Sequence, residues 1–266
     1  MTAYYNDIDP YAAQWLRNLI EAGHIAAGVV DERSIEDVKP GDLRGFTQCH
    51  FFAGIGVWSY ALRQAGWSDD RPVWTGSCPC QPFSNAGKGA GFDDERHLWP
   101  AFFHLIEKCK PSVIFGEQVA SQDGLAWLDL VQADMEGENY ATAANDICSA
   151  GFGATNIRQR LYWVAHAENM QVGAHKREPE ESLKPSLKAG GRSLPATQLP
   201  GKSNGFWADS EWLRGIDGRL YPVEPGTLPL VDGDTKRVGR ISAFGNAINA
   251  EVAKGFIEAY MEVQHA

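Results

Sequence analysis

A strand, a glycine loop and a helix follow one another in residues 47–65, and this succession constrains the fold more than any other stretch. Residues 47–52 predict a strand, and residues 58–65 predict a helix. Between them lies the loop Ala53, Gly54, Ile55 and Gly56. Because glycine lacks a Cβ, such a loop lets backbone come close to a bound molecule. The arrangement is typical of α/β proteins, which bind ligands where strands end.

The same alternation runs through most of the chain. Further strands are expected at residues 4–8, 25–30, 73–75, 112–116, 139–148 and 158–165. Further helices are expected at residues 10–22, 98–108, 123–135 and 250–263. Asp9 can cap the first of these helices, Pro10 suits its first turn and Gly23 ends it. Alternating short strands and helices predict an α/β sheet.

Length and composition favour one sizeable core with a smaller lobe. The chain has 266 residues, of which 44% are hydrophobic. We expect residues 1–165 to form the main domain, residues 166–237 a small loop-rich lobe, and residues 238–266 a helix that returns to the main domain. Within the lobe, residues 168–206 are rich in Glu, Lys, Pro, Ser and Gly without periodicity, which predicts a flexible insertion.

Charge, apolar runs and cysteine count exclude several classes of protein. The formal net charge of −10 argues against coating nucleic acid by bulk electrostatics, although residues 171–202 carry six Lys or Arg against three Glu. No apolar run approaches the roughly 18 residues of a membrane span, and the first residues do not resemble a signal peptide. Five cysteines, an odd number, are then expected to be reduced thiols. These features predict a cytoplasmic protein without a membrane partner.

Cys80 is the strongest candidate for a reactive group. It lies between Pro79 and Gln81-Pro82, and prolines bias their neighbours toward extended or turn backbone. Glu117 follows the apolar run 112–116, where α/β enzymes keep reactive groups. A thiol and an acid at two strand ends suit covalent catalysis on an electrophilic ring. A buried structural cysteine is the alternative, and a metal site at Cys78 and Cys80 lacks a second ligand pair.

These pieces resemble the C5-cytosine methyltransferase family. The resemblance rests on residues 51–56, 79–84, 117–119, 156–160 and 245–248, which stand in the order of the family's motifs. It covers residues 47–165 and 238–262. Two amides depart from the family's pattern, because Gln118 stands for an asparagine and Asn156 for a glutamine. The family implies a Rossmann-like sheet that binds S-adenosylmethionine.

The order of two further motifs departs from the family. Between the glycine loop and Cys80 the chain is too short for two βα units, which need about 30 residues apiece. Residues 5–12 and 29–35 resemble the missing second and third motifs, with Asp7 and Asp31 as their acids. We therefore expect that strands two and three of the sheet precede strand one in the chain, with residues 4–8 pairing in parallel with residues 47–52. If the order is not rearranged, Asp69 or Asp70 would instead be the acid at a strand end next to the glycine loop. An unrelated extension over residues 1–46 is the alternative.

The resemblance implies a role for each matched residue. Cys80 would add to C6 of cytosine, Glu117 would hold the ring at N3 and the exocyclic amine, and Arg158 and Arg160 would brace the base edge, the glutamate and the phosphates. Ordinary solvated charges are the alternative for the arginines. The residues expected at S-adenosylmethionine are Phe52, Ala53, Gly54, Ile55, Gly56, Asp7, Asp31 and Asn246. For Asp7 and Asp31, helix capping or solvation is the alternative.

The resemblance also implies partners. Double-stranded DNA is the expected substrate, with the target cytosine flipped out of the helix and the loop 87–95 closing over it. The lobe around residues 166–239 would read the DNA sequence. Alternatives are the same reaction on tRNA and a DNA-binding relative without turnover. We expect a monomer; a partner restriction enzyme, phage self-protection and regulation remain open as biological settings.

Overall fold

The computed structural model describes residues 3–79, 98–154, 157–167, 211–214, 220–223 and 247–265. The chain divides into two compact units, one formed by residues 1–168 with 233–266 and the other by residues 169–232. In the second unit, β8 (Glu211–Arg214) and β9 (Leu220–Val223) pair antiparallel. That residues 166–237 read DNA stays a prediction.

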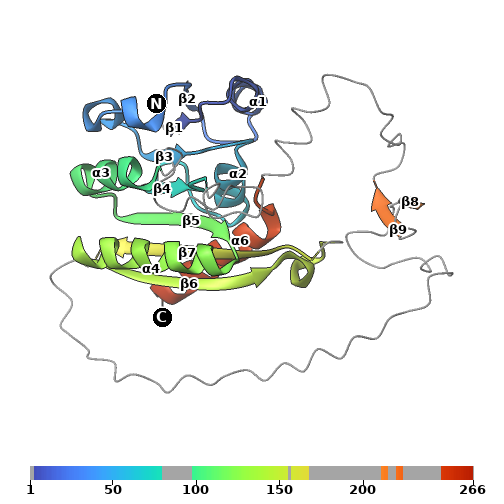
Figure 1. Cartoon of the computed structure of the whole chain (residues 1–266). Helices are drawn as coiled ribbons and strands as arrows, with labels where there is room; N and C mark the ends of the chain where they lie inside the picture. The colour runs from blue at the N-terminus through green and yellow to red at the C-terminus, as the bar shows by residue number, and fades with distance from the viewer. Residues whose placement is uncertain are drawn as a thin grey trace, which may run out of the picture. The chain divides into compact units, whose positions relative to one another are not determined.

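A seven-stranded sheet with the order β2-β1-β3-β4-β5-β7-β6 forms the centre of the larger unit (Figure 1). Its strands are β1 (Ala3–Asn6), β2 (Gly28–Asp31), β3 (Gln48–Phe51), β4 (Val73–Gly76), β5 (Val113–Val119), β6 (Tyr140–Cys148) and β7 (Gln159–Ala167). The first five strands of this order are parallel, whereas β7 runs antiparallel to both β5 and β6. The predicted α/β sheet and its strands are confirmed, with ends shifted by a few residues.

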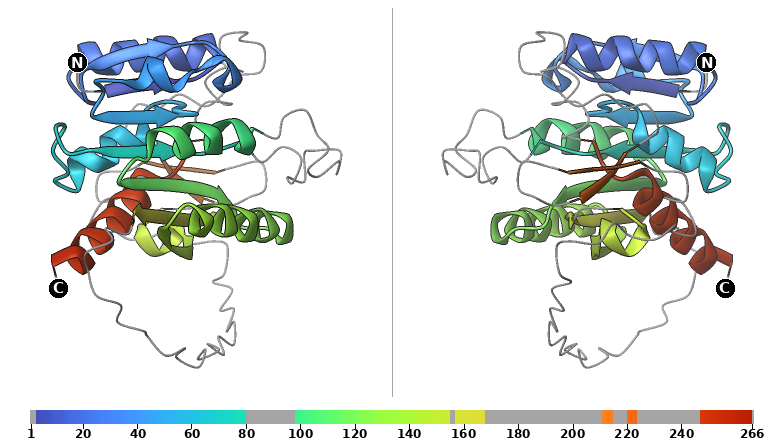
Figure 2. Two further views of the ribbon diagram at one scale, coloured as in Figure 1. Left: turned by 90° about the vertical axis from the view of Figure 1, so that its left-hand side faces the viewer. Right: turned by 90° about the vertical axis from the view of Figure 1, so that its right-hand side faces the viewer.

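Helices cover both faces of the sheet (Figures 1 and 2). They are α1 (Pro10–Glu21), α2 (Val57–Gln64), α3 (Trp99–Cys109), α4 (Gln122–Gly137) and α6 (Ala250–His265), with 3-10 turns η1 (Ile35–Asp37), η2 (Pro40–Leu43) and η5 (Ser149–Phe152). α3 and α4 pack on one face, and α1, α2 and α6 pack on the other. No helix in the described part of the chain is long and apolar enough to cross a membrane.

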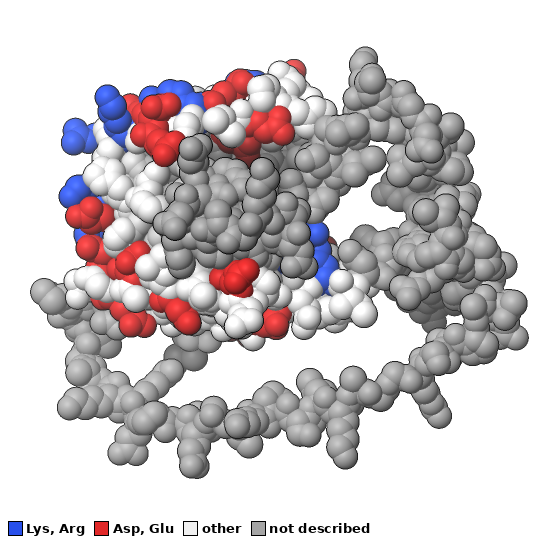
Figure 3. All heavy atoms as spheres, in the orientation of Figure 1, with Lys and Arg blue, Asp and Glu red and all other residues white. Residues whose placement is uncertain are grey.

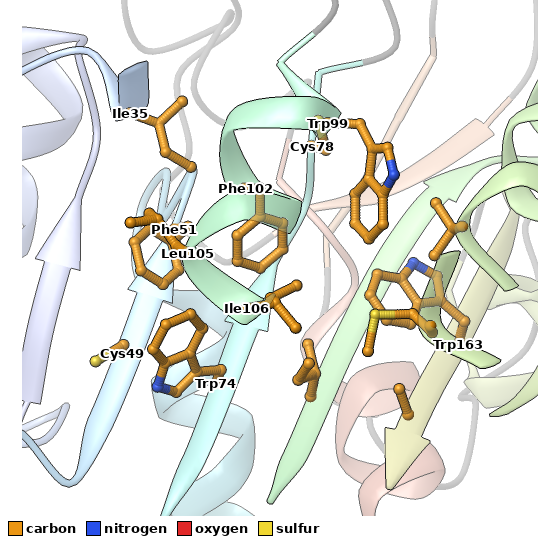
Figure 4. Packing of buried hydrophobic residues seen from close by; sticks show 14 of the residues in the cluster. Ile35, Cys49, Phe51, Trp74, Cys78, Trp99, Phe102, Leu105, Ile106 and Trp163 are labelled. Atoms are coloured by element: carbon orange, nitrogen blue, oxygen red, sulfur yellow. The ribbon is translucent and has the colours of Figure 1, made fainter. Parts of the chain in front are cut away.

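Side chains alternate between the two faces along each strand, as the two-residue period requires. Tyr4 and Phe51 point into the core under α3 and α4, whereas Tyr5 belongs to the core under α1. On the α3 side, Phe51 lies with its ring centroid 5.0 Å from those of Trp74 and Phe102 (Figure 4). Such tilted aromatic pairs stabilise a core beyond the area they bury. This packing holds the strand ends of the candidate site in place.

The first helix begins and ends as the sequence predicts. Asp9 accepts a 2.8 Å hydrogen bond from the backbone N–H of Tyr11, and Pro10 is the first helical residue. Gly23, with φ of 71°, follows the last turn. This early helix start limits β1 to residues 3–6, so that Asp7 lies in the turn between β1 and α1.

The N-terminal strands are part of the sheet. β1 pairs in parallel with β3, with Tyr4 opposite Cys49, and its other edge pairs with β2. The predicted parallel pairing of the first strand with the strand before the glycine loop is therefore confirmed. The other candidate for an acid beside that loop, Asp69, lies in the turn after α2 and pairs instead with Arg63 at 2.6 Å.

Candidate active site

Four neighbouring parallel strands, β1, β3, β4 and β5, share one row of paired residues: Asn6, Phe51, Gly76 and Gly116. The residues that come next on these strands are Asp7, Phe52, Ser77 and Glu117. Because the strands are parallel and in register, these four residues follow at the same edge of the sheet. The candidate site is built along this edge.

The glycine loop is fixed to the end of β1. The backbone N–H of Ala53 donates to the carbonyl of Asn6 at 3.0 Å, and that of Gly54 donates to Oδ2 of Asp7 at 2.7 Å. Phe52, Gly54 and Gly56 have positive φ values of 50°, 53° and 79°. A Cβ built on Gly54 would meet nothing within 4 Å among the described residues. The loop is therefore held by the end of β1, and no described residue fills the space beside Gly54.

Asp7 is half-buried beneath this loop. Burial raises the pKa of its carboxyl, and the backbone hydrogen bonds from Asp9 and Gly54 act in the opposite direction. The structure thus brings Asp7 together with the predicted residues Phe52, Ala53, Gly54, Ile55 and Gly56.

Asp31 ends β2 opposite Asn6, and its carboxyl is engaged within the protein. Arg33 approaches at 2.7 Å, and the Tyr4 hydroxyl donates to Oδ2 at 2.7 Å. Burial acts to raise the pKa of Asp31, but the hydrogen bonds from Arg33 and Tyr4 outweigh it and lower that pKa to about 2. A partner for this acid was not foreseen from the sequence, although Arg33 lies only two residues away.

Glu117 is the buried acid of the site, with 7% of its surface exposed. Arg160, on the neighbouring β7, places its Nε 2.9 Å from Oε1 of Glu117. Burial raises the pKa of Glu117 to about 7, against the opposing effects of Arg160, Arg158 and a hydrogen bond from Ser77. A carboxyl with this pKa can give or accept a proton near neutral pH.

Arg158 lies just before β7 and connects the site to the C-terminal helix. Its Nη2 donates a 3.0 Å hydrogen bond to the carbonyl of Ala247, ahead of α6. Burial lowers its pKa, and the repulsion of Arg160 adds to this, while the Glu117 charge acts in the opposite direction. The predicted residues Glu117, Arg158 and Arg160 are therefore brought together.

The chain can be followed from β4 to Pro79, the residue before Cys80. Gln118 holds this segment, because its Nε2 donates to the carbonyl of Cys78 at 3.3 Å. Cys80, Asn156, Asn246 and the loop 87–95 lie outside the described residues. Their roles stay predictions.

A comparison with known protein families shows to which family part of this chain is related. A family model described as C-5 cytosine-specific DNA methylase matches residues 68–199. Residues 68–199 belong to the C-5 cytosine-specific DNA methylase family. The matched stretch contains Cys80, Glu117, Arg158 and Arg160, and it begins after the glycine loop.

Curated relatives of this methylase family align over the same part of the chain. The type II methyltransferase M.HhaI of Haemophilus parahaemolyticus is 29% identical over 107 residues, which are 39% of this chain and 33% of that protein. M.AplI of Arthrospira platensis is 31% identical over 96 residues, 35% of this chain and 28% of that protein. The chain thus matches about a third of the length of these two relatives.

A solved structure agrees with the fold over more of the chain. The methyltransferase EhMeth of Entamoeba histolytica covers 96% of this chain and 88% of its own, with a TM-score of 0.50 and 14% identity. This likeness concerns the fold alone. Together with the strand order, it assigns the larger unit to the Rossmann-like methyltransferase fold.

Proposed function

We propose that this chain is a DNA (cytosine-5)-methyltransferase that uses S-adenosylmethionine. The observation that carries the proposal is the ion pair of the buried Glu117 with Arg160, which lies beside the segment leading to Cys80. All three residues fall within the stretch matched by the methylase family. Double-stranded DNA as substrate is proposed from the curated relatives, which are named type II methyltransferases.

The residues at the glycine loop fit S-adenosylmethionine. Among the residues that the structure describes, none fills the space over Gly54, and the Asp7 carboxylate beside it accepts hydrogen bonds only, as ribose hydroxyls require. Gly54 and Gly56 would let the backbone approach the methionine part, Phe52 would stack near the adenine and Asp7 would hold the ribose. Asn246 would close the methionine end. Asp31 is the weaker candidate for the adenine amine, since Arg33 and Tyr4 already occupy its oxygens. When bound, the cofactor supplies an electrophilic methyl group.

Cys80 would act as the nucleophile. Its thiolate adds to C6 of the cytosine, and a new S–C6 bond turns C5 into an enamine-like carbon able to accept a methyl group. Afterwards C5 loses its proton and the electron pair returns to expel the thiolate from C6. The cytosine must leave the duplex for this attack, because stacking hides its C5 and C6 faces.

Glu117 would stabilise the ring while charge builds on it. With a pKa of about 7, its protonated carboxyl can donate to N3, and the same group can accept from the exocyclic amine. Arg160 keeps the carboxyl in place and balances its charge when it ionises. Arg158 adds positive charge beside it and would face the DNA.

The surface charge restricts how DNA would approach. Residues 111–154, which form β5, α4, β6 and η5, contain no Lys or Arg. On the face shown in Figure 3, the part formed by α4 and β6 accordingly carries acidic side chains. Phosphates are repelled from such a surface. Approach from the strand ends that carry Arg158 and Arg160 is therefore favoured.

Covalent trapping tests the proposal. A duplex oligonucleotide with 5-fluorocytosine cannot lose a C5 proton, so it should form a stable adduct in the presence of S-adenosylmethionine. A gel shift that survives denaturation is expected with DNA, none without the cofactor and none with Cys80→Ser. An adduct with a matched RNA oligonucleotide instead would reassign the substrate to RNA, and no adduct with either would overturn the proposal.

Because the target sequence is unknown, the oligonucleotide must be chosen by a first experiment. Bisulfite sequencing of plasmid DNA from cells that express the chain should show one recurrent sequence around each methylated cytosine. We propose that the chain is a monomer and is located in the cytoplasm. Sedimentation of the purified chain tests whether it is a monomer.

A further inference from the structure

The segment between β4 and Cys80 contacts β5 at two consecutive residues. Ser77 lies beside Glu117 and acts through its hydroxyl to lower the pKa of the Glu117 carboxyl, and the carbonyl of Cys78 accepts from Gln118. The register explains this, because Gly76 pairs with Gly116 and the next residues on each strand then face each other. Glu117 and the segment that leads to Cys80 therefore lie next to each other.

Trp58 decides which way the Ser77 hydroxyl points. The indole Nε1 of Trp58 lies 3.0 Å from Oγ of Ser77, and an indole N–H can only donate. Ser77 must therefore accept from Trp58. Its own hydrogen is left for another acceptor, and Glu117, which follows the residue paired with Gly76, offers its carboxyl beside it.

Packing holds Trp58 in this position. It is 4% exposed on α2, its ring stacks on Phe115 with centroids 6.0 Å apart, and it meets Tyr162 edge-on at 6.0 Å. Phe115 and Tyr162 belong to β5 and β7, the same strands that carry Glu117 and Arg160. A rigid donor at this point fixes the serine hydroxyl in one orientation.

We propose that Ser77 is a positioning residue for Glu117: Trp58 donates to the Ser77 hydroxyl, which in turn donates to the Glu117 carboxyl. The inference deepens the proposed function and rests on it for its catalytic meaning. The hydrogen-bond relay Trp58–Ser77–Glu117 itself is a property of the free protein and can be tested without DNA or cofactor.

The relay tunes the proton affinity of the acid. Three groups near β7 face Glu117: Arg160 and Tyr162 on the strand and Arg158 just before it. Ser77, the residue after β4, faces it from the other neighbouring strand. A hydroxyl that donates to a carboxylate stabilises the ionised form, so Ser77 works with the two arginines against burial. Donation from Trp58 polarises the serine hydroxyl and strengthens its bond to Glu117. The result keeps Glu117 able to exchange a proton near neutral pH.

A direct titration of Glu117 tests the relay. The full chain is labelled with 13C at the glutamate carboxyl, and the Glu117 signal is assigned by its loss in Glu117→Gln. In Ser77→Ala the titration midpoint should rise by about one pH unit, the size of a lost hydrogen bond to a charged group. Ser77→Thr keeps the hydroxyl and should stay close to the wild type. Trp58→Phe should raise the midpoint by a smaller amount.

A matched control is offered by Ser59, a buried serine on α2. Its hydroxyl contacts the Tyr5 hydroxyl at 2.9 Å and the backbone N–H of Ala26 at 3.2 Å. Ser59→Ala should cost stability and leave the Glu117 midpoint unchanged. An equal shift in Ser59→Ala, or an unchanged or lowered midpoint in Ser77→Ala, overturns the inference. If Ser77→Ala does not fold, Trp58→Phe decides, and an unshifted midpoint there overturns the relay.

The two proposals fail in different ways. If the 5-fluorocytosine adduct never forms but the Ser77→Ala midpoint rises, the relay stands and the proposed reaction is wrong. If the adduct forms and the midpoint does not move, the reaction stands and Ser77 is not a positioning residue. If both proposals hold, the rate of methyl transfer should fall at alkaline pH in Ser77→Ala as in the wild type, but the fall should begin at a higher pH.

Discussion

The backbone N–H of Gly54 donates a 2.7 Å hydrogen bond to the carboxylate of Asp7, a residue 47 positions earlier in the chain. The bond ties the end of β1 to the loop that follows β3, next to it in the sheet. Asp7 is thereby held against the glycine loop. The N-terminal segment thus supplies a group at the candidate cofactor site, although the matched methylase stretch begins at residue 68.

Asp7→Ala should weaken binding of S-adenosylmethionine by about 1–3 kcal/mol, the cost of losing hydrogen bonds to a charged group. The change removes both the proposed ribose contact and the acceptor for the Gly54 N–H. Isothermal titration of the purified chain with S-adenosylmethionine or its demethylated product measures the effect.

Asp9→Ala is the matched control for that experiment. Asp9 lies two residues away and caps α1 through the backbone N–H of Tyr11. Its loss should lower the free energy of unfolding by about 1 kcal/mol, as for other N-caps, and leave cofactor affinity unchanged. Equal affinities in the wild type and Asp7→Ala would mean that residues 1–46 support the sheet without taking part in cofactor binding.

Cys80→Ser should abolish methyl transfer and leave folding and cofactor affinity nearly intact. A serine hydroxyl is a much weaker nucleophile than a thiolate, so the covalent step fails. Incorporation of tritiated methyl groups into DNA measures the loss. Cys78→Ser is the matched control: Cys78 is 4% exposed and packs in the core, so its substitution should cost stability and preserve turnover. More than a few per cent of residual transfer in Cys80→Ser would exclude the covalent mechanism.

Glu117→Gln should lower the rate of methyl transfer roughly 10²-fold or more, the scale of losing a positioned acid. The amide keeps the shape but cannot give a proton to the ring, and it leaves Arg160 without its ion-pair partner. Single-turnover kinetics at saturating DNA isolate the chemical step. Turnover near that of the wild type would assign the carboxyl a structural role.

The positions of the strands and helices could be predicted from the sequence. A strand, a polar residue at its end and a helix follow one another repeatedly along the chain, and the connections between them are short. It predicted that Asp7 lies beside Gly54, because residues 5–12 resemble the family's second motif and the stretch between the glycine loop and Cys80 is too short to contain it. The relay Trp58–Ser77–Glu117 was not foreseen. Its members lie on α2, after β4 and on β5, and their contact depends on the register of β4 against β5.

Asp31 shows a second kind of limit. The resemblance indicated an acid at the end of β2, and the structure has one there, but Arg33 and Tyr4 engage its carboxyl. Tyr4 reaches Asp31 because β1 and β2 are neighbours, and Arg33 turns back over the strand end. Strand patterns locate a residue in the sheet, whereas the turn beyond it decides what its side chain contacts.

Two buried groups, His50 and Glu117, should make the free energy of unfolding depend on pH, with effects of opposite sign. His50 is 1% exposed on β3, its ring stacks on Tyr5 with centroids 4.9 Å apart, and its Nδ1 lies 2.8 Å from Oγ1 of Thr75. Burial lowers its pKa to about 3, against a small opposing effect of Asp69. Burial raises the pKa of Glu117 to about 7.

The depressed pKa of His50 means that its contribution is fully present above the unfolded value of 6.5 and is lost as pH falls toward 3. The raised pKa of Glu117 means that its contribution is fully present below the unfolded value of 4.5 and is lost as pH rises through about 7. Between about pH 5 and pH 6 the two effects oppose each other, each at about 1.4 kcal/mol per pH unit.

The free energy of unfolding in urea, measured between about pH 5 and pH 6, should therefore change in opposite directions in two variants. In Glu117→Gln only the His50 effect remains, so stability should fall on acidification by about 1.4 kcal/mol per pH unit relative to the wild type. In His50→Gln only the Glu117 effect remains, and stability should rise by a similar amount. Other carboxyls, Asp7 included, are common to all three proteins and cancel in the comparison. Parallel pH slopes in the three proteins would show that neither group is held by burial in the protonation state inferred for it.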